Sequence, residues 1–298
     1  MNTIDEKVHV WVVLDQNVVE LAIIMVISLF RTTVARTLHL HIVCDQLQDN
    51  TKTKIQDILA VEQGEHVFDL LDVDSSKLCD GLPWVSHFTK AAYVRLFFPE
   101  IFWQLNRMVY LDTDILAVRD ISTHVIWDFP EPIAAVADEL NPGLNSWVMI
   151  MNFDIIRSTW VFLEAIKWIR ENPDTIRFCD QDGLRAAIGQ GYHHLPFALN
   201  TTCIPESWDF DNNTVLFHYA GAKHKPNKRR WFAWHNKCGL SAKPWINFRE
   251  TTALRVWFCR VNFLKLQQLL AMLFRACIFR PQKFTSRWIR KKMRDLRR

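Results

Sequence analysis

The sequence predicts an α/β fold in which a mostly parallel sheet is flanked by helices on both faces. Short apolar runs rich in β-branched residues alternate with segments of helical periodicity, which is the pattern of parallel strands joined by helices. Two of these runs end directly at acidic residues, as strands do at the edge where α/β sheets bind ligands. With 298 residues, 49% of them hydrophobic, and only 8 glycines and 11 prolines, the chain can bury a sizeable core and is not a low-complexity or disordered protein.

The first strand is expected at residues 8–14, because this apolar run ends at a polar group that contains Asp15 and Asn17. Residues 18–30 are then expected to form a helix packed on that strand. This helix contains Glu20, is shorter than the roughly 20 residues needed to cross a bilayer, and has no basic segment before it. We therefore expect neither a transmembrane helix nor a signal peptide, and a mature protein that starts at or near the first residue.

The remaining elements continue the alternation of extended and helical segments. Strands are expected at residues 37–43, 66–71, 107–111, 133–137 and 147–151, and helices at residues 52–61, 88–98 and 160–170. The last helix is expected to give Trp160, Ile166 and Trp168 to the core. Because Asp112 and Asp114 directly follow the strand at 107–111, they are expected at the same edge of the sheet as the polar group after the first strand.

Glycine and cysteine usage narrows the chemistry. None of the glycines builds a G-x-x-x-x-G-K-[ST] phosphate loop, and the pair Gly189 and Gly191 lacks the third glycine of the dinucleotide fingerprint. A bound phosphate is therefore expected to be held through a metal or basic side chains. The 7 cysteines include no C-x-x-C pair, which argues against a disulfide framework and a cysteine-rich zinc site and favours a reducing cytosol.

Charge is distributed unevenly, although the net charge is only +4. Residues 1–222 carry 15 Lys and Arg against 30 Asp and Glu, residues 223–253 carry 8 against 1, and residues 254–298 carry 13 against 1. Such a basic end is typical of a segment that meets an anionic partner, either a membrane surface or nucleic acid. We therefore divide the chain into a main domain at residues 1–253 and a basic, amphipathic helical segment at residues 254–298.

The pair Asp112 and Asp114 is one of four Asp-x-Asp pairs, so the spacing alone does not select it. It is the pair that directly follows an apolar strand. Two carboxylates held there can converge on a hard divalent cation, which prefers oxygen ligands and can in turn hold a diphosphate. The alternative is a solvated turn.

A second candidate segment closes another short apolar run at His218 and continues into a turn with Lys223, His224 and Lys225. The imidazole of His218 could complete a metal site, since histidine suits Mn²⁺ better than Ca²⁺, and the lysines could neutralise phosphate charge. The alternative is a histidine at a strand end followed by a solvated basic loop. Neither segment identifies a function by itself.

Motifs between residues 8 and 226 occur in an order that selects a family. The most specific combination is Tyr93-Val-Arg95-Leu96, followed by Val109-Tyr-Leu-Asp-Thr-Asp-Ile-Leu116. Asn145 and Asn152 flank an apolar run, and Asp180-Gln-Asp182 and His218-Tyr-x-Gly221 follow. Together these segments resemble glycosyltransferase family 8, the retaining enzymes of the Rossmann-like GT-A fold, and especially the bacterial lipopolysaccharide and lipooligosaccharide α-galactosyl- and α-glucosyltransferases.

The resemblance implies that Asp112, Asp114 and His218 hold a Mn²⁺ ion that bridges the two phosphates of a UDP-sugar. It places Asp15 and Asn17 near the uracil and ribose. The other positions that match donor-site residues of the family are Arg95, Thr113, Asp138, Asn145, Asp180, Gln181, Gly221, His224 and Lys225.

Arg95, Asp180 and Gln181 are the expected catalytic residues of that resemblance. Gln181 is nearest by position to a nucleophile, and a hydrogen bond to the sugar is the role we favour for it. Arg95 is expected to matter to catalysis rather than to folding, because its guanidinium offers fixed donors to sugar or phosphate oxygens. Retention follows either from attack on the leaving-group face or from a double displacement.

Several positions depart from the family pattern. Val18 stands where relatives usually place a tyrosine over the uracil, and Trp147 replaces a glycine, so that its indole is expected to affect acceptor preference more than donor binding. The Lys225-Pro226 pair is one residue further from the metal histidine than usual. Only six residues separate Asp138 from the next family asparagine, where galactosyltransferase relatives carry a long acceptor-covering loop.

The leading hypothesis is a Mn²⁺-dependent retaining transferase that moves galactose or glucose from a UDP-hexose to a lipopolysaccharide core or another surface glycan. One alternative is a relative that binds a nucleotide sugar or glycan without turnover. A nucleic-acid-binding protein that uses the basic tail is another, less favoured because no known nucleic-acid module is visible. The tail at 254–298 is instead expected to dock on an anionic membrane, which implies a cytoplasmic protein at the inner face of the membrane.

Overall fold

The computed structural model describes residues 7–85, 88–125, 128–138, 143–202 and 213–220. The basic segment at residues 254–298 and the boundary at residue 253 lie outside these ranges. Within them, the chain forms a mixed α/β structure around a central sheet, as the sequence predicts. Among these residues no helix is both long enough and apolar enough to cross a membrane.

The strands match the predicted apolar runs closely, and three of the matches, at residues 8–14, 107–111 and 133–137, are complete at both ends. The strands are β1 (Val8–Leu14), β2 (Leu38–Asp45), β3 (Val67–Val73), β4 (Arg107–Leu111), β5 (Ile115–Ala117), β6 (Ile133–Ala137), β7 (Leu144–Asn152), β8 (His193–His194), β9 (Thr201–Thr202) and β10 (Leu216–His218). Every residue of β1 is buried, which explains why its sequence is apolar except for His9: a central strand is covered on both faces.

The helices also follow the predicted pattern, with one change of type. The α-helices are α1 (Val19–Thr32), α2 (Asp49–Glu62), α3 (Ser75–Leu78), α4 (Phe98–Ile101), α5 (Phe153–Thr159), α6 (Val161–Glu171) and α7 (Asp180–Ile188). The 3₁₀ helices are η1 (Lys90–Phe97), η2 (Ile121–Thr123), η3 (Pro173–Thr175) and η4 (Phe197–Asn200).

The helix predicted at residues 88–98 is wrong in its type and its bounds. It begins at Lys90 as η1 and passes into α4 at Phe98. Pro99 provides the physical reason, because proline has no N–H to donate to the carbonyl of Arg95 in an α-helical bond. The N–H of Phe98 reaches that carbonyl instead.

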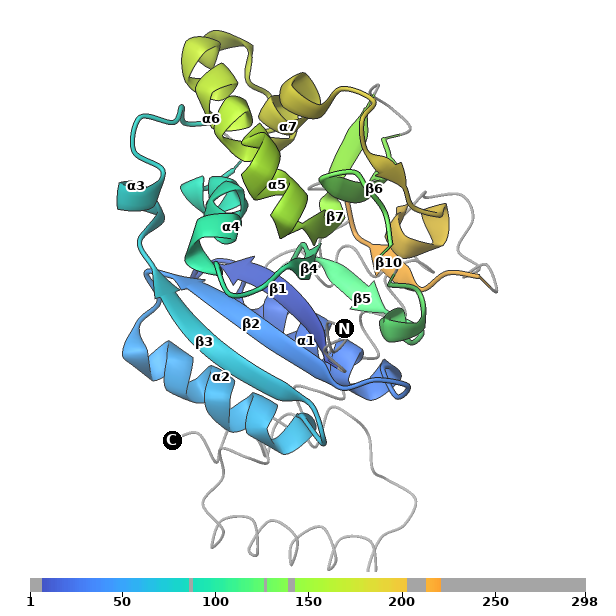
Figure 1. Ribbon diagram of the computed structural model, residues 1–298. Coiled ribbons are helices and arrows are strands. Elements are labelled where there is room, and N and C mark those ends of the chain that lie inside the picture. Colours follow the sequence, from blue (N-terminus) through green and yellow to red (C-terminus); the bar gives the residue numbers. More distant parts are fainter. Residues whose placement is uncertain (1–6, 86–87, 126–127, 139–142, 203–212, 221–298) are drawn as a thin grey trace, which may run out of the picture. The chain divides into compact units, whose positions relative to one another are not determined.

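In the described part of the chain, seven strands form one sheet in the order β3-β2-β1-β4-β7-β6-β8 (Figure 1). Neighbours run parallel from β3 to β4, whereas β7 runs antiparallel to both β4 and β6. A second, smaller sheet pairs β10 with β5 and β9. Because β1 and β4 are parallel neighbours, the residues that follow them emerge at the same edge of the main sheet.

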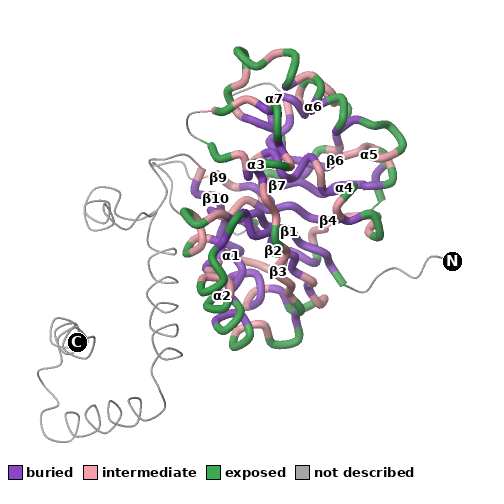
Figure 2. Tube along the Cα trace, turned by 90° about the vertical axis from the view of Figure 1, so that its left-hand side faces the viewer, coloured by how far each residue is buried: buried purple, intermediate pink, exposed green. Residues whose placement is uncertain are grey.

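Buried residues concentrate along the central strands of the sheet (Figure 2). The main core places Trp11 of β1 against Phe98 and Phe102, with ring centroids 4.4 and 3.4 Å away. Ile166 of α6 joins this core and Trp168 packs beside it, as expected.

The prediction that Trp160 enters the core is wrong, because 63% of this residue is exposed. Its backbone is left-handed, with φ of 59°, at the junction where α5 ends and α6 begins. The buried face of α6 starts one residue later and recurs at helical spacing, at Val161, Phe162, Ala165, Ile166 and Ile169. Trp160 therefore lies outside that face.

Candidate active site

Two carboxylates and one imidazole converge where β4 ends. Asp112 and Asp114 belong to the turn between β4 and β5, and the antiparallel pairing of β5 with β10 sets His218 opposite Ile115. The Nε2 atom of His218 lies 3.2 Å from Oδ1 of Asp114. One ligand atom from each of the three side chains lies within 4.8 Å of the others, and both Asp114 and His218 are buried. This arrangement is suited to a divalent cation, and Asp112, Asp114 and His218 are called the metal cluster below.

A chain of hydrogen bonds fixes the proton on the His218 ring. The backbone N–H of Trp147 donates to Oδ1 of Asn145, so this oxygen is an acceptor and the Asn200 atom beside it, at 3.1 Å, is the amide nitrogen. Oδ1 of Asn200 consequently faces Nδ1 of His218 at 2.9 Å and accepts its proton in a hydrogen bond. A neutral His218 therefore presents the lone pair of Nε2 toward Asp114, where only a proton or a cation can bridge the two.

Arg95 is the centre of the adjoining buried charge network. Its guanidinium lies 3.4 Å from Oδ1 of Asp112 and 3.3 Å from Oδ2 of Asp180. It also donates to the carbonyl oxygen of Ser146 at 2.6 Å and lies 4.1 Å from the centre of the Tyr110 ring. Removing Arg95 would leave the buried Asp180 carboxylate without its cationic partner, so we expect Arg95 to contribute to folding stability as well as to the site.

The carboxylates around Arg95 have different environments. Burial raises the pKa of the Asp180 carboxyl to about 7, with the Arg95 guanidinium opposing the rise and Asp112 adding to it. Oδ1 of Asp112 accepts a hydrogen bond of 2.6 Å from the Tyr110 hydroxyl and remains partly exposed. Asp112 therefore belongs both to this network and to the metal cluster, and it is partly accessible to solvent.

Gln181 is buried beside this network at the start of α7. Its Oε1 accepts the backbone N–H of Ser146 at 2.9 Å, which fixes the orientation of the amide. The Nε2 atom is buried without a hydrogen-bond partner among the described residues. Gly183, two residues further along α7, allows α7 to approach α6 closely, because a Cβ at this position would lie 2.5 Å from Cδ1 of Ile169. The third residue of the motif, Asp182, accepts the backbone N–H groups of Arg177 and Phe178 and so ties the preceding segment to the first turn of α7.

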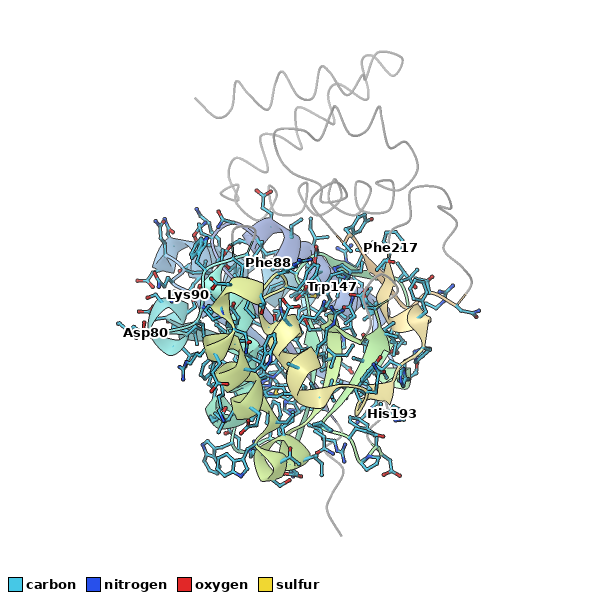
Figure 3. The ribbon with its side chains drawn as sticks, turned by 90° about the horizontal axis from the view of Figure 1, so that it is seen from above. Asp80, Phe88, Lys90, Trp147, His193 and Phe217 are labelled. Carbon is cyan, nitrogen blue, oxygen red and sulfur yellow. The ribbon has the colours of Figure 1, made fainter. Side chains whose placement is uncertain are left out.

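Trp147 occupies a place beside the metal cluster. Figure 3 labels Trp147 together with Phe217, the neighbour of His218 in β10. The indole meets the His218 ring edge-on, with ring centroids 4.7 Å apart. The Trp147 carbonyl also accepts the N–H of Asp112 at 3.0 Å. The large side chain at this departure from the family pattern therefore contacts a candidate metal ligand directly.

A separate cavity of about 320 Å³ opens at the same edge of the sheet, beyond β1, β2 and β3. Asp15 and Asn17 line it, and the Asn17 N–H donates to Oδ1 of Asp15 at 2.8 Å. Trp84, in the segment before η1, and Lys90, the first residue of η1, also line it. Val18 is not among the lining residues, whereas Trp84 offers an indole that is 71% exposed.

The other predicted site residues fall into two groups. Thr113 lies in the metal-cluster turn, and Asp138 follows β6 at the same sheet edge, where its carboxylate pairs with Arg185. The second group, Gly221, His224 and Lys225, lies outside the described residues.

Sequence reasoning missed Asn200, Ser146 and Trp84. Asn200 lies in a 3₁₀ turn with no local motif, and Ser146 acts through its backbone, so neither residue carried a signal in the sequence. Trp84 lies in the apolar stretch Leu82-Pro-Trp-Val85, and only the structure shows that its indole is exposed.

Comparison with known proteins decides the family, because the family model of Glycosyl transferase family 8 matches residues 9–234. The chain belongs to glycosyltransferase family 8. It is related to lipopolysaccharide glycosyltransferases of that family. The match covers the metal cluster and the Arg95 network.

Two curated relatives illustrate the range of this family. The chain is 25% identical over 244 residues to lipopolysaccharide 1,2-glucosyltransferase of Escherichia coli (strain K12), with 70% of each chain covered. It is 34% identical over 130 residues to general stress protein A of Bacillus subtilis (strain 168), covering 37% of this chain and 45% of that protein. The chain thus spans less than half the length of the latter relative.

A solved structure confirms the GT-A fold. The galactosyltransferase LgtC, in complex with donor and acceptor sugar analogs, superposes with a TM-score of 0.68 at 17% identity, covering 82% of this chain and 95% of that one. The glycosyltransferase GlyE of Streptococcus pneumoniae TIGR4 gives a TM-score of 0.60 at 17% identity, covering 85% of this chain and 64% of that one.

Proposed function

We propose that this family 8 member is a Mn²⁺-dependent retaining hexosyltransferase that uses UDP-galactose or UDP-glucose. Its acceptor is a lipopolysaccharide core or another surface glycan. The observation that carries the proposal is the convergence of Asp112, Asp114 and His218 beside the buried Arg95 network.

The ligand set fits the cation. Two carboxylates and a neutral imidazole suit Mn²⁺, and the hydrogen bond from Nδ1 of His218 to Asn200 leaves Nε2 free to coordinate. When bound, the ion neutralises negative charge on the departing diphosphate. Asp112 and Asp114 hold it and Asn200 orients His218. In the transfer, the bond from the anomeric carbon to the diphosphate oxygen breaks and the acceptor oxygen bonds to that carbon, while the acceptor proton passes to a phosphate oxygen or to solvent.

Gln181 supports this reaction as a hydrogen-bond donor. Its Oε1 is already engaged by the Ser146 N–H, so the side chain is a poor nucleophile in this geometry. Its buried Nε2 lacks a partner among the described residues, and leaving such a donor unpaired costs about 1–3 kcal/mol. A hydroxyl oxygen of the donor sugar would accept a hydrogen bond from this Nε2 atom and so supply the missing partner. Asp180 and Arg95 complete the wall on which the sugar is positioned.

The functional test is a hydrolysis screen of the purified protein against UDP-galactose, UDP-glucose, UDP-xylose and UDP-N-acetylhexosamines, with and without Mn²⁺. We expect slow release of UDP from one hexose donor that requires the metal. Binding of Mn²⁺ and UDP with neither transfer nor hydrolysis would instead identify a non-catalytic binding protein.

We further propose that the cavity beyond β1 takes the uridine and that Trp84 provides the stacking face that Val18 does not. Trp84→Ala is then expected to weaken UDP binding about tenfold or more, since a base stacked on an aromatic ring gains roughly 1–3 kcal/mol. Isothermal titration with UDP measures the effect. Trp103→Ala is the matched control, because Trp103 is 76% exposed and does not line the cavity. Equal losses in both variants would contradict this role.

The basic segment at residues 254–298 is proposed to dock the enzyme on the anionic inner face of the cytoplasmic membrane. Residues 287–298 hold seven Lys and Arg interleaved with Trp288, Ile289, Met293 and Leu296. Each basic residue near such a surface contributes roughly 1 kcal/mol. A truncation after Pro281 is expected to lose salt-sensitive flotation with anionic vesicles and to retain hydrolysis of a soluble donor. Unchanged flotation, or binding to oligonucleotides in preference to vesicles, would refute the docking role.

A further inference from the structure

Three histidines form a second cluster, remote from the metal cluster at the end of β4. His9 of β1, His39 of β2 and His41 of β2 each offer a ring nitrogen within 4.8 Å of the others. Strand pairing brings them together, because His9 lies directly opposite His39 in the parallel register. The two-residue repeat of a strand then places His41 on the same face of the sheet.

The cluster lies in the first half of β1 and β2, whereas the proposed donor site lies beyond their ends. Asp15 lies six positions after His9, just past the end of β1, a distance of about 20 Å at the rise of an extended strand. The histidines are therefore too far away to contact a substrate held at Asp112 and Asp114.

Asp69 of β3 orients two of the rings. Its carboxylate lies 3.0 Å from Nε2 of His39 and 3.0 Å from Nδ1 of His41, so each of these nitrogens donates an N–H hydrogen bond to it. The other nitrogen of each neutral ring then carries a lone pair. This nitrogen is Nδ1 in His39 and Nε2 in His41. This carboxylate–histidine arrangement is the one that holds ligating imidazoles in metal sites.

His9 supplies the third nitrogen. Its Nδ1 lies 2.9 Å from Nε2 of His41, so the two atoms share one proton without a metal. If the His9 proton moves from Nδ1 to Nε2, both facing nitrogen atoms carry a lone pair, and neither ring has lost a proton. Nitrogens that share a tetrahedral zinc at about 2.0–2.1 Å are separated by roughly 3.3 Å and point at the ion rather than at each other. The His9 and His41 rings, whose planes are 9° apart, therefore have to part slightly and also turn before their lone pairs converge.

We propose that His9, His39 and His41 bind Zn²⁺, with Asp69 as the positioning residue. Imidazole ligands suit zinc, and three protein ligands leave a fourth position for water. Solvent has access, because the side chains of His39 and Asp69 are 24% and 39% exposed, whereas that of His41 is 7% exposed. The ion would join β1 and β2 directly and β3 through the carboxylate, which gives it a structural role at this side of the sheet.

The test is a titration of the chelator-treated full chain with Co²⁺, read by its visible absorption, followed by displacement with Zn²⁺. The Asp114→Asn variant is used as the background, so that the signal is independent of the donor-site cluster. We expect the intense bands of tetrahedral cobalt and a rise in melting temperature on adding zinc.

His39→Gln is expected to lose the cobalt bands and the zinc-dependent shift, whereas Asp69→Asn should retain the fold and bind about 10- to 100-fold more weakly. His194→Gln, on the exposed end of β8, is the matched control and should behave as the parent. The absence of cobalt bands in the Asp114→Asn background, or equal affinity in His39→Gln and its parent, would overturn the proposal and leave a hydrogen-bonded stack of histidines. Neither result bears on the transferase activity.

Discussion

Asp114→Asn is expected to lower transfer and donor hydrolysis by about a thousandfold while the protein remains folded. The magnitude follows from the loss of a metal ligand whose bound ion stabilises the charge of the departing diphosphate. The fold should survive because asparagine has the same shape and its amide can donate to Nε2 of His218, which lies 3.2 Å from Oδ1 of Asp114. The measurement is kcat/KM for the preferred donor, with circular dichroism as the check on folding.

Asp72→Asn is the matched control for this change. Asp72 belongs to another Asp-x-Asp pair, and its carboxylate meets Lys52 at the surface, away from the metal cluster. Its loss should leave kcat/KM unchanged. Full activity in Asp114→Asn, or in chelator-treated parent protein, would show that the metal assignment is wrong.

Arg95→Lys is expected to reduce both stability and activity, by about 2 kcal/mol of unfolding free energy and about a hundredfold in kcat/KM. The guanidinium contacts Asp112, Asp180 and the Ser146 carbonyl at the same time. A single ammonium group keeps the charge but cannot reach all three, so the carboxylates lose their fixed positions. Urea unfolding and donor hydrolysis measure the two effects separately.

Arg157→Lys separates a stability effect from an effect on the site. Arg157 is partly buried and donates to the carbonyl oxygens of Pro99, Phe102 and Leu105, remote from the metal cluster. We expect it to lose stability and to keep kcat/KM at temperatures where it remains folded. If Arg95→Lys showed the same pattern, Arg95 would be a structural residue only.

The sequence predicted β1 and β4 well because nearly every residue in them is buried. Residues 8–14 and 107–111 match β1 and β4 completely, since an apolar run has clear ends where polar residues begin. Helix details depended on local backbone effects that hydrophobic periodicity does not capture. Pro99 produced the η1–α4 break, and the left-handed backbone at Trp160 moved the buried face of α6 by one residue.

The site was predictable where a motif is local and not where partners come from distant segments. Asp112 and Asp114 were visible at a strand end, and His218 at another. The orientation of His218, however, depends on Asn200 and Asn145, which meet only after β7 and η4 have packed together. In the same way, the spacing of His39 and His41 is apparent in the sequence, but only the pairing of β1 with β2 adds His9.

The most direct test of the central claim is a Mn²⁺ titration followed by electron paramagnetic resonance, in the presence and absence of UDP, on the parent protein and on Asp114→Asn. The signal of the free hexaaqua ion reports how much metal remains unbound. We predict that the parent binds one ion at this cluster, that UDP tightens the binding because its phosphates add oxygen ligands, and that Asp114→Asn loses this UDP-dependent binding. Binding that UDP does not affect, or that is the same in both proteins, would contradict a diphosphate-holding metal at Asp112, Asp114 and His218.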